Sequence, residues 1–552
     1  MNDSAVKDID VLIVGAGING AGLFRDLSAQ RLSCVIIDKG DFGSGTSAAP
    51  SRLIHGGLKY LETGELRLVA ESTYERNLLL KNAAHVVKPL PTVIPIYSWT
   101  KGVGAAIRTF FGSRTAPRSR GAVLIKIGLT LYDYFGSRAR FMPKHGMLGR
   151  RKALATLPAL NPRIVAVGTY YDATVTAPER LVMELVQDGV KVSDRSEAHN
   201  WSAVTGQTDG VVSFARPDGT EGRVRPKLVV NAAGPWIDQV NAALGFESQL
   251  IGGTKGSHIL LDHPDLVKQL DGRMIYFEAN DGRILLVFPY LGKALVGSTD
   301  IPSREPDQAH CTDDETGYFM SSLRDLLPGL AFDESQIVYS YAGIRPLPNS
   351  EGVEPGLISR DHSAPVQDAA QGRPFPVISL VGGKWTTFRA FSAEVADMVL
   401  GRLGRDRKTT TDAMPIGGAR QLPDANRRDG WIAEVASESS AEPARVEVLL
   451  DRYGATARLI AAHERDTPVL FDEAPAFGAA EIDWIARNEQ VVHLEDVILR
   501  RTPLAITGQL TKSLLERIGR IVGAALNWND ERIDAEIART LGVLESRHGV
   551  RF

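Results

Sequence analysis

The most regular pattern of apolar and polar positions lies at the N-terminal end of the chain. An apolar run over residues 11–14 is followed by closely spaced glycines, and a second apolar run over residues 35–37 is followed by Asp38. The glycines are Gly15, Gly17, Gly20 and Gly22. Such runs predict buried strands, and residues 21–30 predict a helix between them. The segment therefore predicts a strand, a glycine-rich turn, a helix and a second strand that ends in an acid.

The periodicity changes twice further along the chain. Residues 64–80 predict an amphipathic helix whose apolar positions are Leu66, Val69, Tyr74, Leu78 and Leu79. Residues 192–260 and 273–299 contain short apolar runs between glycines, which predict antiparallel strands. After about residue 410 the pattern becomes helical.

Two helices are predicted near the C-terminal end. Residues 512–526 place Leu514, Leu515, Ile518, Ile521, Val522 and Ala525 on one face. Asn529 and Asp530 can cap the next helix, whose apolar stripe is Ile533, Ile537, Leu541 and Leu544.

These patterns predict an α/β protein with a Rossmann-like cofactor domain, an antiparallel β-rich substrate domain and an all-helical C-terminal domain. A chain of 552 residues is too long for a single core. We expect the cofactor domain to contain residues 1–90, 160–235 and 355–410. The substrate and membrane-facing domain is expected to contain residues 91–159 and 236–354, and the helical domain residues 411–552.

The N-terminal turn has the residue types that a dinucleotide requires. Gly15 permits the tight turn, Gly17 lets the backbone approach a pyrophosphate, and Gly20 allows close helix packing. Ile18 and Asn19 lie in the same turn as candidate cofactor-binding residues, and the N-terminus of the following helix attracts phosphate. Asp38 follows the second strand, where it is placed to accept hydrogen bonds from a ribose.

No second glycine fingerprint follows a strand elsewhere in the sequence. Enzymes that bind both a flavin and a nicotinamide cofactor usually carry two. A single fingerprint favours FAD as the only dinucleotide, with electrons that leave to an acceptor other than NAD. From this motif alone, NAD in place of FAD stays open.

Bulk composition describes an ordinary folded protein. The net charge is −3, and 23% of the residues are charged. The two cysteines, Cys34 and Cys311, cannot form a disulfide framework, which is typical of a reducing compartment. The N-terminus lacks a signal-peptide pattern, and no apolar stretch reaches 18 residues, so we expect a cytoplasmic protein without a membrane span.

Residues 81–158 are strongly basic. They contain fourteen lysines and arginines but a single acid, Asp133. Apolar stretches at 103–111 and 122–135 carry aromatic residues within this segment. The pattern suits contact with an anionic membrane surface, or a solvated basic face that attracts an anionic substrate. No recognition motif accompanies the charge, which disfavours a nucleic-acid partner.

Three further segments are candidate walls of a cofactor site. Their small and hydroxyl residues permit close approach to a flat ring, although each segment alone could be an ordinary turn. The candidate residues are Thr46, Ser47, His55, Gly56 and Gly57 in the first segment, Ala233 and Gly234 in the second, and Gly383, Lys384, Trp385 and Thr386 in the third.

Three charged or titratable residues complete the candidate chemistry. His258 can act as a general base near neutral pH. Arg345 and Lys384 follow glycines and are suited to bind an oxyanion. Taken singly, His258 is as well explained as a core histidine and Arg345 as an ion-pair partner. No metal site is predicted.

The ordered set of motifs resembles the FAD-dependent, quinone-linked glycerol-3-phosphate dehydrogenases. The segments that carry the resemblance are 15–22, His55-Gly-Gly-Leu-Lys-Tyr-Leu61, Asn231-Ala-Ala-Gly-Pro-Trp236, Lys255-Gly-Ser-His258, Gly343-Ile-Arg-Pro-Leu347 and Gly382-Gly-Lys-Trp-Thr-Thr387. The later segment Asp496-Val-Ile-Leu-Arg-Arg-Thr502 is similar too.

This resemblance implies a fold, a reaction and a location. The fold would be that of D-amino acid oxidase with a helical C-terminal cap. The enzyme would oxidise sn-glycerol 3-phosphate to dihydroxyacetone phosphate and pass electrons through FAD to a membrane quinone. It would lie peripherally on the inner face of the cell membrane, with a homodimer as one possible assembly.

The resemblance also implies residue roles. Arg345 and Lys384 would hold the phosphate or hydroxyls of the substrate, and Lys59 and Tyr60 would line the pocket. His258 would remove the C2 hydroxyl proton.

Two departures from the family pattern leave the substrate open. Lys59 stands where the family commonly has arginine, and residues 170–180 lack an acidic pair that many members carry. Another polyol phosphate, such as erythritol phosphate, therefore stays open as the substrate. The sequence is also compatible with a flavin oxidase that reduces O₂, or with a non-catalytic anion-binding module on a membrane surface.

Overall fold

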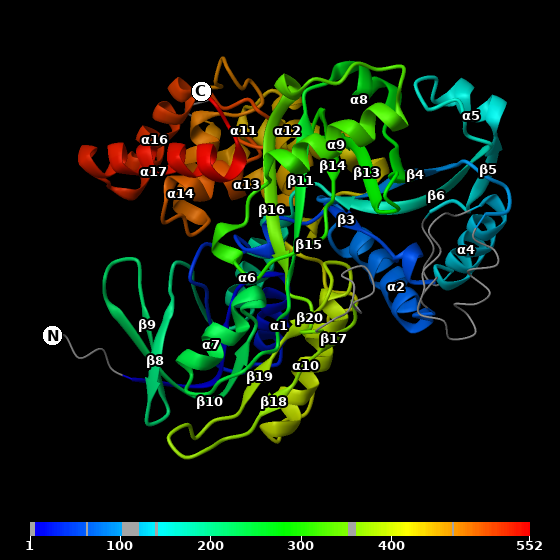
Figure 1. Cartoon of the computed structure of the whole chain (residues 1–552). Coiled ribbons are helices and arrows are strands. Elements are labelled where there is room, and N and C mark those ends of the chain that lie inside the picture. The colour runs from blue at the N-terminus through cyan, green and yellow to red at the C-terminus, as the bar shows by residue number, and fades with distance from the viewer. Residues whose placement is uncertain (1–5, 62–63, 102–120, 138–141, 351–359, 466–468) are drawn as a thin grey trace.

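The computed structural model describes residues 6–61, 64–101, 121–137, 142–350, 360–465 and 469–552. Two β-sheets form its centre, and most helices after residue 428 gather on one side (Figure 1). The predicted combination of a cofactor fold, a β-rich region and a helical tail is confirmed.

The first sheet is mainly parallel and contains the predicted N-terminal unit. Its strands run in the order β18-β19-β10-β1-β2-β7, with a β8–β9 hairpin on β10. Their bounds are β1 Lys7–Val14, β2 Cys34–Ile37, β7 Glu197–His199, β8 Val204–Thr208, β9 Val211–Ala215, β10 Glu221–Asn231, β18 Val366–Gln367 and β19 Val377–Ser379. Val14 pairs with Ile37 on one side and with Asn231 on the other. The carboxyl ends of β1, β2 and β10 therefore meet at one edge, where ligands bind in open α/β sheets.

Both faces of this sheet are covered. Side chains of β1 such as Val11 and Ile13 pack under α1 (Ile18–Ala29), α6 (Pro178–Val192) and α10 (Phe388–Arg402). The alternate side chains Leu12 and Val14 pack with the β8–β9 hairpin and α7 (Ile237–Ala243). This burial on both faces explains why β1 reads as an uninterrupted apolar run.

The second sheet is mostly antiparallel, as predicted for residues 273–299. Its strands run in the order β15-β11-β14-β13-β12-β4-β6-β3, with β16 on β11 and β5 on β6. Their bounds are β3 Leu53–Ile54, β4 Val87–Ile96, β5 Gly146–Gly149, β6 Ala166–Val175, β11 Thr254–Leu261, β12 Met274–Glu278, β13 Ile284–Tyr290, β14 Lys293–Gly297, β15 Ile301–Pro302 and β16 Ile337–Arg345. A small further pair joins β17 (His362–Ser363) to β20 (Val381–Gly382).

Two predicted features of the strands differ in the structure. Strand β10 was expected among antiparallel strands, yet it pairs in parallel with β1 and β19 and only its first half is antiparallel to β9. Strands β3 and β6 fall in segments predicted for the cofactor domain but pair in the second sheet. The chain crosses between the sheets within short loops, which local periodicity does not reveal.

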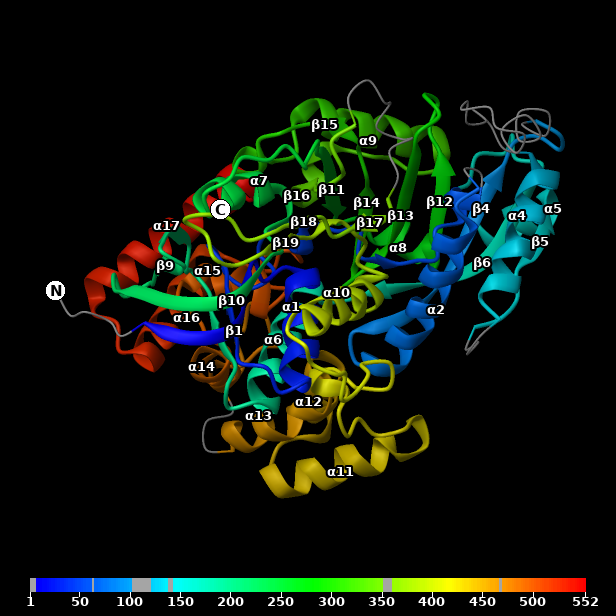
Figure 2. The same cartoon turned by 90° about the horizontal axis from the view of Figure 1, so that it is seen from below.

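Helices cover the second sheet on its two faces. Alternate residues such as Leu260 and Phe288 pack against the C-terminal helices, whereas Ile259 and Val287 pack against α9 and its neighbours. The helices other than those already given are α2 Leu66–Asn82, α4 Ala122–Phe135, α5 Arg150–Thr156, α8 Pro264–Leu270, α9 Asp313–Leu326, α11 Arg428–Ser439, α12 Pro443–Tyr453, α13 Ala457–Glu464, α14 Ala479–Asn488, α15 Leu494–Asp496, α16 Lys512–Leu526 and α17 Asp530–His548. The view from below shows the helical region beside the first sheet as well (Figure 2).

Local signals predicted the last two helices well. Helix α16 has the predicted bounds, and Asn529 caps α17 because its side chain accepts a hydrogen bond from the Arg532 backbone N–H. Helix α2 also forms, but its buried face is largely polar and includes Thr73, Arg76 and Asn77, while Leu66 is exposed. The apolar stripe predicted for this helix is therefore only partly buried.

Within the described residues, no helix is long and apolar enough to cross a membrane. Cys34 is buried in β2 and Cys311 is half-buried, and both thiols are free. Burial raises the pKa of both thiols. The predicted apolar stretch at 103–111 lies outside the described residues, and the one at 122–135 is α4.

Candidate active site

The glycine turn has the tight geometry that the sequence predicted. Gly15 has a φ of 104°, and a Cβ there would lie 2.5 Å from the carbonyl oxygen of Ala232. A Cβ on Gly20 would lie 1.9 Å from the carbonyl oxygen of Gly15. Backbone atoms therefore exclude any side chain at these two positions. Because both residues are glycines, the turn, helix α1 and the end of β10 can lie in close contact.

The start of α1 contacts the short 3₁₀ helix Thr46–Ala48. The Ile18 backbone N–H donates to Ser47 Oγ at 2.9 Å, and a Cβ on Gly17 would lie 3.1 Å from the same oxygen. Thr46 Oγ1 donates to the carbonyl oxygen of Ile344 at 2.5 Å. The predicted loop residues Thr46 and Ser47 therefore lie between the glycine turn and the end of β16.

Asp38 lies at the carboxyl end of β2, beside the glycine turn. Its carboxylate accepts hydrogen bonds from the backbone N–H groups of Ala16, at 2.7 Å, and Gly40, at 2.9 Å. Burial raises the pKa of Asp38 to about 6. Each carboxylate oxygen has a further lone pair, so both can still accept a ribose hydroxyl.

Several buried polar atoms around the turn have no hydrogen-bond partner among the described residues. They are Asn19 Oδ1, Trp385 Nε1 and Thr387 Oγ1. Buried polar atoms are normally satisfied, so an unpartnered set indicates a ligand that supplies donors and acceptors. The residues present therefore fit a large polar cofactor such as FAD.

The motif at 382–387 reaches the same place. Gly383 has a φ of 90°, and a Cβ there would lie 2.9 Å from Asn19 Nδ2. Thr386 Oγ1 accepts a hydrogen bond from the His55 backbone N–H at 3.1 Å. The structure thus brings together Asn19, His55 and the 383–386 turn, although they are distant in the sequence.

A buried polar cluster holds the His55-Gly56-Gly57 turn in place. The Gly56 backbone N–H donates to the hydroxyl oxygen of Tyr132 at 2.7 Å, and the Tyr132 hydroxyl donates to Asp172. Arg76 of α2 donates to the same carboxylate at 3.0 Å. This cluster explains the polar inner face of α2.

The second predicted wall lies directly after β10. Ala233 precedes the 3₁₀ helix Gly234–Trp236, and Gly234 has a φ of 56°. The Ala233 backbone N–H is held by Asn231 Oδ1 at 3.1 Å. The segment therefore lies against the glycine turn, because a Cβ on Gly15 would meet both Ala232 and Ala233.

His258 is fully buried in β11 and electrically neutral near pH 7. Its Nε2 lies 2.8 Å from Ser51 Oγ, and its ring stacks on Tyr341. Burial lowers the pKa of His258 well below its ordinary value, and the charges of Arg345 and Arg52 lower it further. A neutral imidazole is the form that accepts a proton.

Arg345 ends β16 and is held in place by the segment 298–300. It donates to the carbonyl oxygen of Thr299 at 3.1 Å, to Asp300 Oδ1 at 3.0 Å and to Ser298 Oγ at 3.0 Å. Burial lowers the pKa of Arg345 to about 10, with a further contribution from Arg360. The guanidinium remains charged at neutral pH.

Arg360 is a cation that the sequence motifs did not identify. It donates to Asp300 Oδ2 at 3.1 Å, so Asp300 joins it to Arg345. Burial lowers the pKa of His55 and Lys384, and the charge of Arg360 lowers both further. Burial raises the pKa of Tyr60, and Arg360 opposes that rise. Nothing in the surrounding residues distinguishes this arginine from others, so only the fold reveals it.

Lys384 completes the group of cations. Its Nζ lies 3.7 Å from the centre of the Tyr60 ring and 3.5 Å from Ser72 Oγ. Burial lowers the pKa of Lys384 to about 7. Lys59 lies on the short helix Leu58–Leu61, but its side chain lies outside the described part of the chain.

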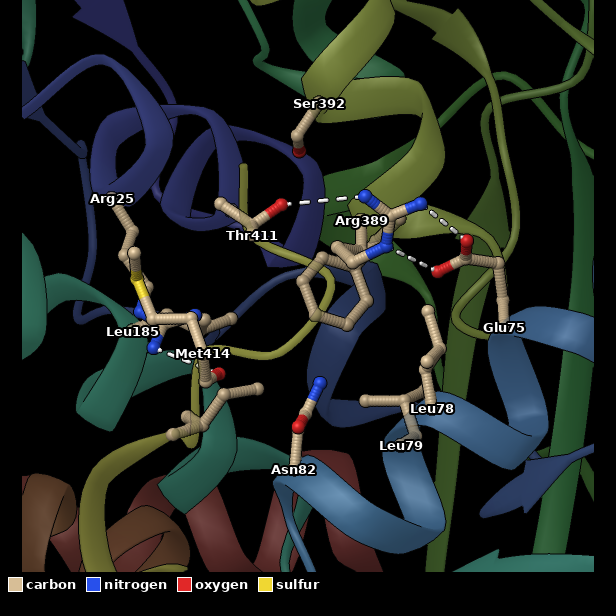
Figure 3. Close-up of a pocket in the computed structure, with 13 residues that line it drawn as sticks. Arg25, Glu75, Leu78, Leu79, Asn82, Leu185, Arg389, Ser392, Thr411 and Met414 are labelled. Carbon is tan, nitrogen blue, oxygen red and sulfur yellow. Dashed lines mark hydrogen bonds and ion pairs between the residues drawn. The ribbon is translucent and has the colours of Figure 1, made fainter. Parts of the chain in front are cut away.

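A separate small cavity lies behind α10, between α1, α2 and α6 (Figure 3). Arg389, two residues after the 382–387 motif, points into this region, where its Nε donates to Glu75 at 2.8 Å. The cavity volume is about 20 Å³, room for one water molecule. Arg389 therefore links α10 to α2 and is not one of the site cations. Among the described residues no group of side chains is suited to hold a metal ion.

Comparison with known proteins agrees with this architecture. Residues 10–367 match the family model described as FAD dependent oxidoreductase, and residues 409–533 match the C-terminal domain of alpha-glycerophosphate oxidase. Fold and site therefore define an FAD-dependent oxidoreductase of the D-amino acid oxidase type with a helical C-terminal domain.

Two relatives indicate a narrower family within this class of FAD-dependent oxidoreductases. The chain is 31% identical to a glycerol-3-phosphate dehydrogenase from Synechocystis, over 96% of this chain and 95% of that protein. It is 29% identical to the aerobic glycerol-3-phosphate dehydrogenase of Bacillus subtilis, over 91% and 88% of the two chains. The chain belongs to the glycerol-3-phosphate dehydrogenase family.

Solved structures show the same fold. The glycerol-3-phosphate dehydrogenase of Bacillus halodurans, complexed with FAD, superposes with a TM-score of 0.73 at 21% identity, covering 98% of this chain and 95% of that chain. The L-alpha-glycerophosphate oxidase of Mycoplasma pneumoniae, with FAD bound, has a TM-score of 0.53 at 17% identity and covers 74% of this chain and 98% of that chain.

Proposed function

We propose that this protein oxidises sn-glycerol 3-phosphate to dihydroxyacetone phosphate. The observation that carries the proposal is the group of cations Arg345, Arg360 and Lys384, of which Arg345 lies near the neutral imidazole of His258. The names of the relatives support the same substrate. When bound at the glycine turn, FAD would supply the acceptor for the hydride that leaves C2.

The cations suit a phosphate dianion. A guanidinium can donate two hydrogen bonds to phosphate oxygens, whereas an ammonium acts as a compact charge. Asp300 aligns Arg345 and Arg360 through its two oxygens, so both guanidinium groups face one region. Lys384, over the Tyr60 ring, provides a third charge for phosphate or hydroxyl oxygens.

His258 is the proposed general base. Loss of a hydride from C2 requires loss of the proton from the C2 hydroxyl, and a neutral imidazole can accept it. Tyr60 lines the pocket, and Lys59 is proposed there from its motif.

An anaerobic substrate panel tests this function. Glycerol 3-phosphate is expected to bleach the visible absorbance of the bound flavin, whereas glycerol and amino acids leave it unchanged. Bleaching by an amino acid but not by glycerol 3-phosphate would refute the proposal. Faster bleaching by erythritol phosphate would change the substrate to that polyol phosphate.

We further propose that electrons pass to a membrane quinone and that α4 contacts the membrane at the inner face of the cell membrane. The outer face of α4 carries exposed apolar residues at the spacing of one helix stripe: Val123, Ile127, Leu131 and Tyr134. Trp99 is exposed and its carbonyl accepts from the Val123 N–H at 3.3 Å, so an interfacial aromatic adjoins this helix.

Basic residues lie at the same end of the molecule. Helix α5, with exposed Arg150, Arg151 and Lys152, lies at the same end of the molecule as α4 in both views (Figures 1 and 2). The apolar stripe of α4 and the basic residues of α5 together suit contact with an anionic lipid surface. An oxidase would instead reduce O₂, so the relative rates with a soluble quinone analogue and with O₂ distinguish the two acceptors.

A further inference from the structure

The segment 496–502, to which the proposed reaction assigns no role, contacts the cofactor domain. Residues Val497–Arg501 form one turn of π-helix after α15. From this turn Arg501 donates to both oxygens of Asp41, at 2.7 and 2.8 Å, and Arg500 Nε donates to Asp41 Oδ2 at 2.6 Å. The helical region thus contacts the loop that follows β2.

This contact is a buried ionic cluster. The side chains of Asp41 and Arg501 are completely buried, and Arg500 is nearly so. Asn200 donates a further hydrogen bond to Asp41 at 2.9 Å. Although burial raises the pKa of Asp41, the charges of Arg501 and Arg500 hold it well below its ordinary value.

On the helical side the two arginines are fixed by their own partners. Arg501 Nη2 donates to the carbonyl oxygen of Glu489 at 3.1 Å, and the Arg501 carbonyl accepts from Arg180 at 3.0 Å. Arg500 forms an ion pair with Asp496, four residues earlier. The guanidinium groups therefore have little freedom to follow Asp41 if it moves.

On the cofactor side, Asp41 belongs to the loop that shapes the nucleotide site. Three residues earlier, Asp38 bonds to the Ala16 N–H of the glycine turn. Gly43 N–H donates to the Ala16 carbonyl at 2.9 Å, and Ser44 N–H donates to the Asp41 carbonyl at 3.1 Å. Asp41 therefore lies at the base of a loop that contacts the turn on two sides.

We propose that Arg500 and Arg501 are positioning residues for FAD, which act through Asp41 on the 38–44 loop. The inference rests on the proposed placement of the ribose at Asp38. Removal of one partner leaves the buried Asp41 charge incompletely compensated, so the loop must rearrange to solvate it. The helical region thereby controls how firmly the adenosine end of FAD is held.

The rate of FAD release from the full-length holoenzyme tests this inference. Free FAD fluoresces more strongly than bound FAD, so release after dilution is followed directly. We expect Arg501→Lys, which keeps the charge but loses the fork of donors, to release FAD at least about tenfold faster. Asp41→Asn, which removes the charge with little change in shape, is expected to act in the same direction and decides the matter if Arg501→Lys does not fold.

The matched control is Arg445→Lys. Arg445 is also largely buried and pairs with two carboxylates, Glu464 and Glu481, but all three belong to the helical region. We expect this variant to lower the thermal unfolding midpoint and to leave FAD release within twofold of the parent. Equal acceleration by Arg445→Lys and Arg501→Lys would show general destabilisation and overturn the inference.

A further variant separates the placement of the ribose from the role of the arginines. If Asp38→Asn leaves FAD release unchanged, the ribose is not at Asp38 and the inference fails with that placement. If Asp38→Asn accelerates release while Arg501→Lys and Asp41→Asn do not, only the role of the arginines is refuted. Acceleration in all three supports it.

Discussion

The imidazole of His258 stacks on the phenol of Tyr341, with ring centres 4.8 Å apart and planes inclined by 13°. The two residues face each other on the paired strands β11 and β16. The phenol hydroxyl donates to the carbonyl oxygen of Pro50 at 2.9 Å, so Tyr341 holds one face of the imidazole against the loop that carries Ser51.

His258→Ala is expected to reduce kcat by about 10²–10⁴, the contribution of a well-placed general base. The flavin should stay bound, because none of the contacts at the glycine turn involves His258. Stopped-flow measurement of flavin reduction checks this. Tyr341→Phe retains the stacked ring and serves as the control. Equal rates of flavin reduction in His258→Ala and the parent would show that His258 is not the general base.

The pKa of Lys384, about 7, predicts a pH dependence of substrate binding. Below this pH the side chain is a cation, and as the pH rises through it the charge is lost, so kcat/KM should fall on the alkaline side. Protonation of the phosphate, whose second pKa is about 6, limits kcat/KM on the acidic side. The profile of kcat/KM against pH should therefore be bell-shaped.

Lys384→Arg provides the control for this profile. A guanidinium keeps its charge throughout the measured range, so the alkaline limb should move up by more than one pH unit or disappear. An unchanged limb would mean that another group titrates.

Arg345→Ala is expected to lower kcat/KM for the phosphorylated substrate by about 10- to 100-fold. This range follows from the loss of charge-assisted hydrogen bonds to phosphate, worth roughly 1.5–3 kcal/mol. The rate with unphosphorylated glycerol at high concentration should change much less. A similar loss with both substrates would assign Arg345 to the reacting carbon and not to the phosphate.

Charge on the outer face of α4 should weaken membrane binding. Ile127→Glu introduces a carboxylate into the exposed stripe and is expected to reduce co-sedimentation with anionic vesicles severalfold, without loss of activity toward a soluble acceptor. Leu459→Glu, at an exposed leucine of α13, is the control and should sediment like the parent. Unchanged co-sedimentation of Ile127→Glu would exclude this face.

Two glycine substitutions should have opposite effects. Gly20→Ala places a Cβ against the Gly15 carbonyl oxygen and should yield protein that neither folds properly nor binds flavin. Gly542→Ala lies at an open, exposed position within α17 and should raise the free energy of unfolding by about 0.5–1 kcal/mol. Flavin content after purification and denaturant unfolding measure the two outcomes.

Features that depend on neighbouring residues could be predicted from the sequence. The glycine turn, the bounds of α16 and the Asn529 cap all follow from local spacing. The polar inner face of α2 could not be predicted in this way, because Arg76 pairs with Asp172, which is 96 residues away in the sequence. Arg360 was missed for the same reason, since Asp300, which aligns it, lies 60 residues earlier.

The resemblance of the motifs to a known family grouped residues that are distant in the sequence, which local patterns could not do. It placed His258, Arg345 and Lys384 in one site. In the structure, Arg345 lies close enough to His258 to lower its pKa, and Asp300 joins Arg345 to Arg360, whose charge acts on Lys384. The resemblance assigned no role to 496–502, because the partner of Arg501 is 460 residues away. Asp38 was expected to accept hydrogen bonds from a ribose, and in the structure its carboxylate also accepts hydrogen bonds from two backbone N–H groups.

The separation between Asp41 and Arg501 has a consequence for synthesis of the protein. Strand β1 is made first, but its partner β10 follows some two hundred residues later, and the arginines that hold Asp41 emerge near the end of translation. Contacts of such long sequence separation form slowly, because the loop entropy is lost before the contact is gained. A ribosome-bound chain therefore presents an open nucleotide site, and loading of the flavin is expected to follow release of the finished polypeptide.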